Sequence, residues 1–264
     1  MGRALLRLTA AAVLAFLYLP LLIIVLFAFN ADRGQAWPIR EFSPRWIGAA
    51  IANDGVRQAL WLSLQAAAGA TALALLLGTL AALAVHRFRF FGRESVSFLL
   101  VLPLALPGIV TGMALNATIN AFGVSFGLLT IIVGHATFCV VTVYNNVIAR
   151  LRRSSRSIEE ASMDLGADPW QTFRHITLPA VATALLAGGL LAFALSFDEV
   201  IVTTFTAGTQ ATLPIWILDN LRQANQRPIV NVVAVFVILI SAIPVYLSQR
   251  LAGGESNAPG SLGR

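Results

Sequence analysis

The sequence predicts an all-α membrane protein with six transmembrane helices, and three observations support this prediction. Hydrophobic residues make up 58% of the 264 residues and charged residues only 11%, which leaves too few polar side chains to cover a water-soluble globule. Several long stretches contain no charged residue at all. The 18 basic residues are all arginine, and they cluster at the ends of those stretches, a pattern typical of membrane topology rather than of nucleic-acid binding.

The composition also excludes several kinds of chemistry. A chain without lysine has neither the lysine of a phosphate-binding P-loop nor a lysine for Schiff-base or general-base catalysis. Its single cysteine, Cys139, allows no intrachain disulfide and no cysteine-based metal cage. His86 and His135 have no companions at ligand spacing. We therefore predict no catalytic residue, no metal site, no cofactor and no nucleic-acid partner.

The first two transmembrane helices follow from the lengths of the charge-free runs. A helix needs about 20 apolar residues to cross the hydrocarbon core of a bilayer. Residues 8–31 form a run of 24, which predicts a helix at 8–30 with a kink at Pro20, retained rather than cleaved as a signal peptide. The second run is rich in alanine and leucine and predicts a helix at 58–85.

The third and fourth helices form a predicted hairpin. Residues 95–149 are charge-free for 55 residues, which would be about 80 Å long as one helix, so this stretch must fold back on itself. Glycine, serine and asparagine gather at 120–127 and predict the turn, with helices at 95–119 and 127–149. The first arm contains residues that break or flex a helix: Pro103, Pro107, Gly108 and Gly112.

Helices at 180–205 and 229–249 complete the set. Residues 1–251 then form one transmembrane domain, and the glycine-rich tail 252–264 is predicted to be disordered. With the N-terminus inside, twelve arginines lie on the inner side and six on the outer side, which together make the 18. This asymmetry predicts that both termini are cytoplasmic.

The predicted inner loop at 150–178 contains signals for two short helices. Ser157 with Glu160 fits a capping box, and Gly166 fits a left-handed helix end. Asp168, followed by proline and then by glutamine at the third position, repeats the start signal, and the second helix is expected to end at Pro179. Two helices that project from the membrane favour a docking surface for a soluble partner, the alternative being an amphipathic interfacial loop.

The segment EEASMDLGADPWQTFRHITLP resembles the EAA signature of permease subunits of ABC importers. Six positions fit at the right spacing, and Ser162 replaces the second alanine: Glu160, Ala161, Gly166, Ile176, Leu178 and Pro179. LPLALPGIVTGMAL, GHATFCVVTVYNNVIARLRR and ALSFDEVIVTTFTAG are similar to the second permease subunit of the spermidine/putrescine branch.

The resemblance implies the permease fold of a type I ABC importer in a bacterial inner membrane, with a coupling helix in the inner loop. It implies a second, homologous permease, two copies of a cytoplasmic ATPase and an extracytoplasmic substrate-binding protein as partners. The ATPase, and not this chain, would hydrolyse ATP.

An acidic pair, Asp198 and Glu199, interrupts the apolar fifth helix near its predicted outer end. Acidic residues at membrane depth usually face a cavity or a partner. We expect Asp198 first, and Glu199 second, to line a pathway for a polyamine-like cation, with Phe197 and Trp216 as candidate aromatic faces. The alternative is an interfacial pair that reaches water or an arginine of the outer loop.

Two alternatives to polyamine import remain open from the sequence. One is the same importer class with another cargo: an amino-acid derivative, an opine-like compound or a metal complex. The other is an autonomous channel or carrier, which would need a relay of ionisable groups through the membrane. Between Arg57 and Arg150 all charged residues lie at 87–94, in an inner loop, so the sequence disfavours such a relay.

Overall fold

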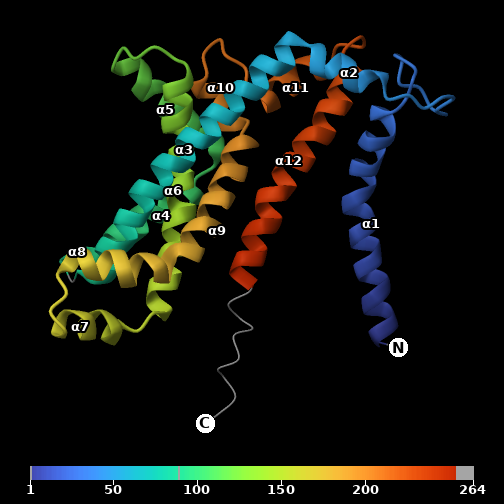
Figure 1. The fold of residues 1–264 in the computed structure, drawn as a ribbon. Coiled ribbons are helices and arrows are strands. Elements are labelled where there is room, and N and C mark those ends of the chain that lie inside the picture. The colour runs from blue at the N-terminus through green and yellow to red at the C-terminus, as the bar shows by residue number, and fades with distance from the viewer. Residues whose placement is uncertain (1, 89, 254–264) are drawn as a thin grey trace. The chain divides into compact units, whose positions relative to one another are not determined.

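The computed structural model describes residues 2–88 and 90–253, and this part of the chain is almost entirely helical (Figure 1). Its one extended pairing is an isolated bridge between Asn30 and Phe42. The elements in chain order are α1 (Gly2–Ala28), α2 (Arg45–Ala52), α3 (Asp54–Arg87), α4 (Arg93–Ala105), α5 (Gly108–Ala121), α6 (Leu128–Arg153), α7 (Arg156–Asp164), α8 (Pro169–Thr172), the π-helical turn η1 (Phe173–Thr177), α9 (Leu178–Phe197), α10 (Ile201–Thr206), α11 (Leu213–Leu221) and α12 (Arg227–Gly253).

Five helical stretches in the described residues are long and apolar enough to cross a membrane, or six if the bent pair α4 and α5 counts as one span. This confirms the all-α membrane class. The pair is bent by 104° at Leu106 and Pro107, so the predicted break in the third span is confirmed. The turn between α5 and α6 also falls where the sequence predicted it.

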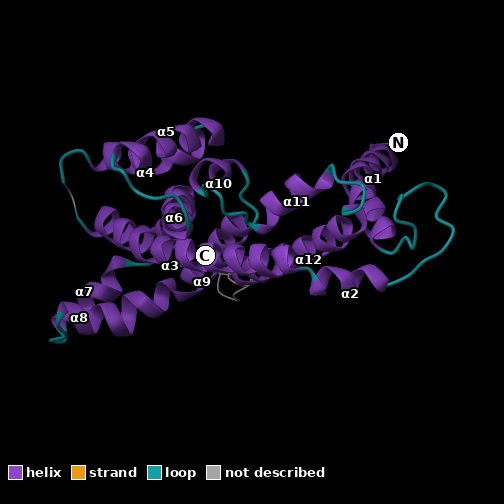
Figure 2. Cartoon of the chain, turned by 90° about the horizontal axis from the view of Figure 1, so that it is seen from above, coloured by secondary structure: helices purple, strands orange, loops and turns teal. Residues whose placement is uncertain are grey.

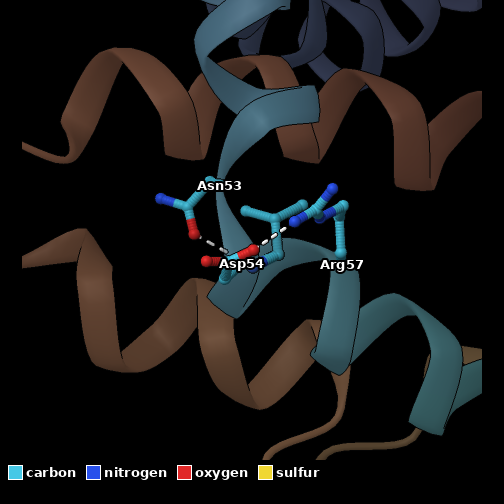
Figure 3. A network of polar contacts seen from close by, with 4 residues as sticks. Asn53, Asp54 and Arg57 are labelled. Carbon is cyan, nitrogen blue, oxygen red and sulfur yellow. Dashed lines mark hydrogen bonds and ion pairs between the residues drawn. The ribbon is translucent and has the colours of Figure 1, made fainter.

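The chain divides into two compact units, each of which we describe by itself. The first comprises residues 1–61 and 212–240. In it, the indole of Trp46 donates a hydrogen bond to the carbonyl of Asn30 at 2.8 Å, and the Arg45 guanidinium lies over its ring. Asn53 separates α2 from α3: its side-chain oxygen accepts the amide of Val56 at 3.1 Å, while Asp54 pairs with Arg57 (Figure 3).

The second unit comprises residues 62–211 together with the described residues from 241 to 253, and it holds the larger core. Here α6 packs along α9, and α10 packs against both α5 and α6, as the two views agree (Figures 1 and 2). A small residue also lets α3 approach α6 closely, since a Cβ added at Gly78 on α3 would lie 2.8 Å from the carbonyl oxygen of Val140 on α6. Close approach over glycine and alanine is the usual basis of helix association in membranes.

The fifth span and the tail differ from the prediction. The fifth span does not continue from 180 to 205 as one helix: α9 ends at Phe197 and α10 begins at Ile201. At its other end the span is longer than predicted, because α8, η1 and α9 follow one another without a gap from Pro169. The predicted tail begins too early, since α12 continues to Gly253; residues 254–264 lie outside the described residues.

Candidate functional site

The predicted docking loop contains one well-formed helix, α7, with a glycine turn at its end. The predicted capping box of Ser157 and Glu160 is wrong, because α7 already begins at Arg156 and Ser157 lies within its first turn. The predicted stop at Gly166 is confirmed by its φ of 89°. The Gly166 amide donates to the carbonyl of Met163 at 2.9 Å, and the Ala167 amide donates to the carbonyl of Ser162 at 3.1 Å, which is the Schellman pattern of a helix end.

The second start signal is confirmed in full. The carboxylate of Asp168 accepts the amides of Trp170 and Gln171, both at 2.8 Å, and the side chain of Gln171 accepts the Asp168 amide in return. The expected stop at Pro179 is wrong. Proline is tolerated in the first turn of a helix, and the preceding turn is widened: the Leu178 amide donates to the carbonyl of Phe173, five residues back.

Two hydrogen bonds hold α7 against the α8–η1 segment. The buried hydroxyl of Thr177 donates to the carboxylate of Glu159 at 2.7 Å, and the hydroxyls of Ser162 and Thr172 lie 3.2 Å apart. Glu159 and Ser162 are three residues apart on one helix and therefore share a face. Ser162 thus has a bonding role that an alanine at this position of the signature could not fill.

The remaining signature residues lie mostly at the surface. Glu160, Ala161 and Gly166 are exposed, and Ile176 is half-buried. Beside them, large apolar side chains are also exposed: Ile158, Met163, Leu165 and Trp170. Leu165 is 89% exposed, although it is aliphatic and lies next to a helix end. Exposed apolar side chains of this kind are typical of a surface that contacts another protein or a membrane.

The acidic pair lies at the opposite end of the second unit from α7 (Figure 1). Asp198 ends α9, and its side chain is exposed. Glu199 is half-buried, and its carboxylate accepts the amide of Val202 in the first turn of α10 at 2.9 Å. The prediction placed both acids on a continuous helix; they instead occupy a break between two helices, where Glu199 caps the second one.

Neighbouring helices fix α10 at its C-terminal end, where helix carbonyls lack partners of their own. The amide side chain of Asn116 on α5 donates to the carbonyl of Phe205 at 2.7 Å, and the hydroxyl of Thr130 on α6 donates to the carbonyl of Thr206, also at 2.7 Å. The last two carbonyls of this short helix are thus bonded to protein, as irregular backbone at membrane depth requires.

Neither candidate aromatic face is open. Phe197 is 1% exposed and stacks on Phe193 at 6.1 Å between ring centroids. Trp216 belongs to the first unit, where it is 8% exposed. No ion pair in the described part of the chain involves Asp198 or Glu199. Among the same residues, no group of three or more His, Cys, Asp or Glu could hold a metal ion.

Comparison with known proteins gives consistent results. Residues 74–253 match the family described as binding-protein-dependent transport system inner membrane component. The chain is 38% identical to the putrescine transport system permease protein PotI of Escherichia coli K12 over 248 residues, which cover 89% of this chain and 87% of that protein. It is 36% identical to the spermidine/putrescine transport system permease protein PotC of Haemophilus influenzae over 241 residues, 90% and 93% of the two chains.

Solved structures show the same fold with different cargoes. A chain of a bacterial ABC transporter involved in the import of alginate, an acidic polysaccharide, superposes with a TM-score of 0.68 at 14% identity, over 96% of this chain and 94% of that one. A chain of an amino acid ABC transporter with histidines superposes with a TM-score of 0.59 at 14% identity, over 81% and 98%. The fold by itself therefore does not determine the cargo.

Proposed function

Since the chain belongs to the family of binding-protein-dependent transport system inner membrane components, and is a transport permease subunit rather than an enzyme, we propose that it forms half of the pathway through which an ATP-driven importer moves a polyamine-like cation. The proposed polyamine cargo rests on sequence similarity. Relatives that match about nine-tenths of this chain are named for putrescine or for spermidine and putrescine. Asp198 adds a chemical reason, because an exposed carboxylate at a helix break attracts an ammonium group.

The proposed assembly lies in the inner membrane of a bacterium and has three kinds of partner. This chain pairs with a second, homologous permease, two cytoplasmic ATPase copies bind beneath them, and an extracytoplasmic binding protein delivers the cation. Both termini, together with α7, face the cytoplasm. The excess of arginine on that side supports this orientation.

In this proposal α7 and the glycine turn after it dock into the ATPase. The exposed Ile158, Leu165 and Trp170 supply apolar contact, and Glu160 supplies a charge at the rim. Glu159 and Ser162 face the other way and keep α7 attached to the helix that continues into the membrane. Glu160→Lys should therefore weaken ATPase association while membrane insertion stays normal.

The cargo is tested by uptake of radiolabelled putrescine and spermidine into cells that carry the whole transporter, with and without this subunit. Loss of both uptakes on deletion supports a polyamine cargo. Unchanged uptake moves the cargo to an amino-acid derivative, an opine-like compound or a metal complex. Membrane amounts of the other subunits should be measured in parallel, so that loss of assembly is not read as loss of a pathway.

The role of Asp198 is tested by Asp198→Asn, which keeps the shape of the side chain and removes its charge. The matched control is Glu94→Gln, which neutralises an acid in the first turn of α4. We expect uptake of the cation to fall in the first variant and to remain in the second, with normal assembly in both. Equal uptake in the two variants would remove Asp198 from the pathway.

A further inference from the structure

A buried histidine bridges the helix break that carries the acidic pair. His135 lies on α6 and is 1% exposed. Its Nδ1 is 2.7 Å from the hydroxyl of Ser196, in the last turn of α9, and its Nε2 is 2.8 Å from the hydroxyl of Thr203, in α10. One side chain therefore contacts both helices that flank Asp198 and Glu199.

We propose that His135 is a positioning residue that holds α9 and α10 in one relative orientation and thereby fixes where Asp198 and Glu199 lie. Its effect on transport rests on the proposed function, whereas its effect on the break does not. Thiol labelling therefore measures the effect on the break, and putrescine uptake measures the effect on transport.

Counting hydrogens assigns the direction of these hydrogen bonds. A threonine hydroxyl has a single hydrogen, and that of Thr203 is donated to the carbonyl of Glu199 at 2.7 Å. The Thr203 oxygen must therefore accept from His135, so Nε2 carries the hydrogen. In the neutral ring Nδ1 then accepts from Ser196. The result is a directed chain that begins in α9, passes through His135 and Thr203, and ends on the backbone of Glu199.

The surrounding contacts explain why the break depends on this chain. Asn116 and Thr130 anchor the end of α10 to α5 and α6. The carboxylate of Glu199 is fixed to the first turn of α10 through Val202. Only three residues, 198–200, separate α9 from α10. If the histidine contact is lost, α10 keeps its bonds to α5 and α6 and α9 stays packed along α6, but the side chain that links the end of α9 to α10 is gone. Residues 198–200, with Asp198 among them, can then change conformation.

The chain offers a clean background for the measurement, because Cys139 is its only cysteine. Cys139 lies one helical turn after His135 on α6, is equally buried, and donates to the carbonyl of Ala192 on α9. Cys139→Ala gives the cysteine-free parent against which every variant is compared. Val200→Cys, introduced into this parent, places a half-buried reporter thiol inside the break.

The rate of thiol labelling by a membrane-impermeant maleimide is then measured on the assembled transporter in membrane vesicles. Relative to the Val200→Cys parent, His135→Leu and Thr203→Val should each raise the labelling rate by about fivefold, as expected when one buried hydrogen bond no longer holds a segment closed. His135→Gln retains a donor and an acceptor and should change the rate by less than about twofold. Thr203→Val keeps the side-chain shape, so it remains informative if His135→Leu assembles poorly.

Labelling rates in His135→Leu and Thr203→Val that equal the parent rate would overturn the proposal. Uptake of radiolabelled putrescine in the same variants, without the reporter thiol, gives the second result. Faster labelling together with a raised KM for uptake supports both the positioning role and the cation pathway. Faster labelling with no putrescine uptake even in the Cys139→Ala parent leaves the positioning role intact and contradicts the proposed cargo.

Discussion

Gly166 should set the stability of the turn that ends α7, and the effect of replacing it can be calculated from the backbone alone. Its φ is 89°, and a Cβ added there would meet no atom within 4 Å. The cost of a side chain is therefore conformational rather than steric. It should be about 1 to 2 kcal/mol for alanine, and more for β-branched valine. Asparagine tolerates the left-handed region, so Gly166→Asn should cost only part of this amount.

Hydrogen exchange of the α7 amides in the purified, assembled transporter measures this cost. A loss of about 1 to 2 kcal/mol in local stability raises the open population about five- to thirtyfold, and exchange should accelerate by that factor in Gly166→Ala. If α7 is the docking helix, ATPase copurification and uptake should fall in the order Gly, Asn, Ala, Val at this position.

The matched control is Gly123→Ala, in the turn between α5 and α6. Its φ is 64°, and a Cβ would again meet nothing within 4 Å, so the backbone cost is similar. This variant should leave α7 exchange and ATPase association unchanged. Faster exchange in Gly166→Ala with normal ATPase association would refute the docking role of α7, and unchanged exchange would refute the strain argument itself.

Three further predictions test individual contacts. Gly78→Ala should lower the thermal stability of the subunit by about 1 to 3 kcal/mol, because its Cβ would lie 2.8 Å from the Val140 carbonyl, whereas Gly48→Ala, in a helix with open space around it, should be neutral or slightly stabilising in the same melting assay. Asp168→Ala removes the acceptor of two backbone amides and should cost about 1 kcal/mol, seen as faster amide exchange at 170–172. Thr177→Val removes the donor to the Glu159 carboxylate and should raise the protease sensitivity of α7 while the rest of the subunit stays protected.

Much of the fold was predictable because it depends on local or compositional signals. The charge-free run at 95–149 is too long for one helix, so a hairpin follows from bilayer thickness, and glycine and asparagine mark its turn. Pro107 explains the bend between α4 and α5. Gly166 and Asp168 were found in the same way, since a positive φ and a capping carboxylate each require particular residue types.

The break at Asp198 could not be found by these signals. It contains neither proline nor glycine, and the residues on both sides are good helix or membrane residues. The contacts that stabilise it are distant in sequence: His135 is 61 residues from Ser196, and Asn116 is 89 residues from Phe205. The hydrophobic periodicity and the helix propensity of a single segment carry no information about such distant partners.

The predictions for the start of α7 and for the end of the second short helix are wrong for a related reason. Serines at 154, 155 and 157 offer several possible starts, and the box pattern selected Ser157, although α7 begins at Arg156. The contact that matters, between Glu159 and Thr177, spans 18 residues and was not visible as a pattern. The sequence predicts a stop at Pro179, yet the π-helical turn before it lets the helix continue.

The helix α9 joins the docking loop to the acidic pair. Its irregular segments lie at its two ends, the π-helical turn η1 before it and the break at 198–200 after it. Over 20 residues it should be about 30 Å long, with a regular hydrogen-bond ladder between η1 and Phe197. Packed along α6, it is expected to move as a rigid rod rather than to bend. A displacement of α7, passed on through Glu159 and Thr177, would therefore reach Ser196 almost undiminished. There the hydrogen bond from Ser196 to His135 is the first contact that meets the displacement. If this bond holds, the displacement passes into α10, and if it breaks, α9 moves without α10. The acidic pair lies between the two helices and is affected in either case.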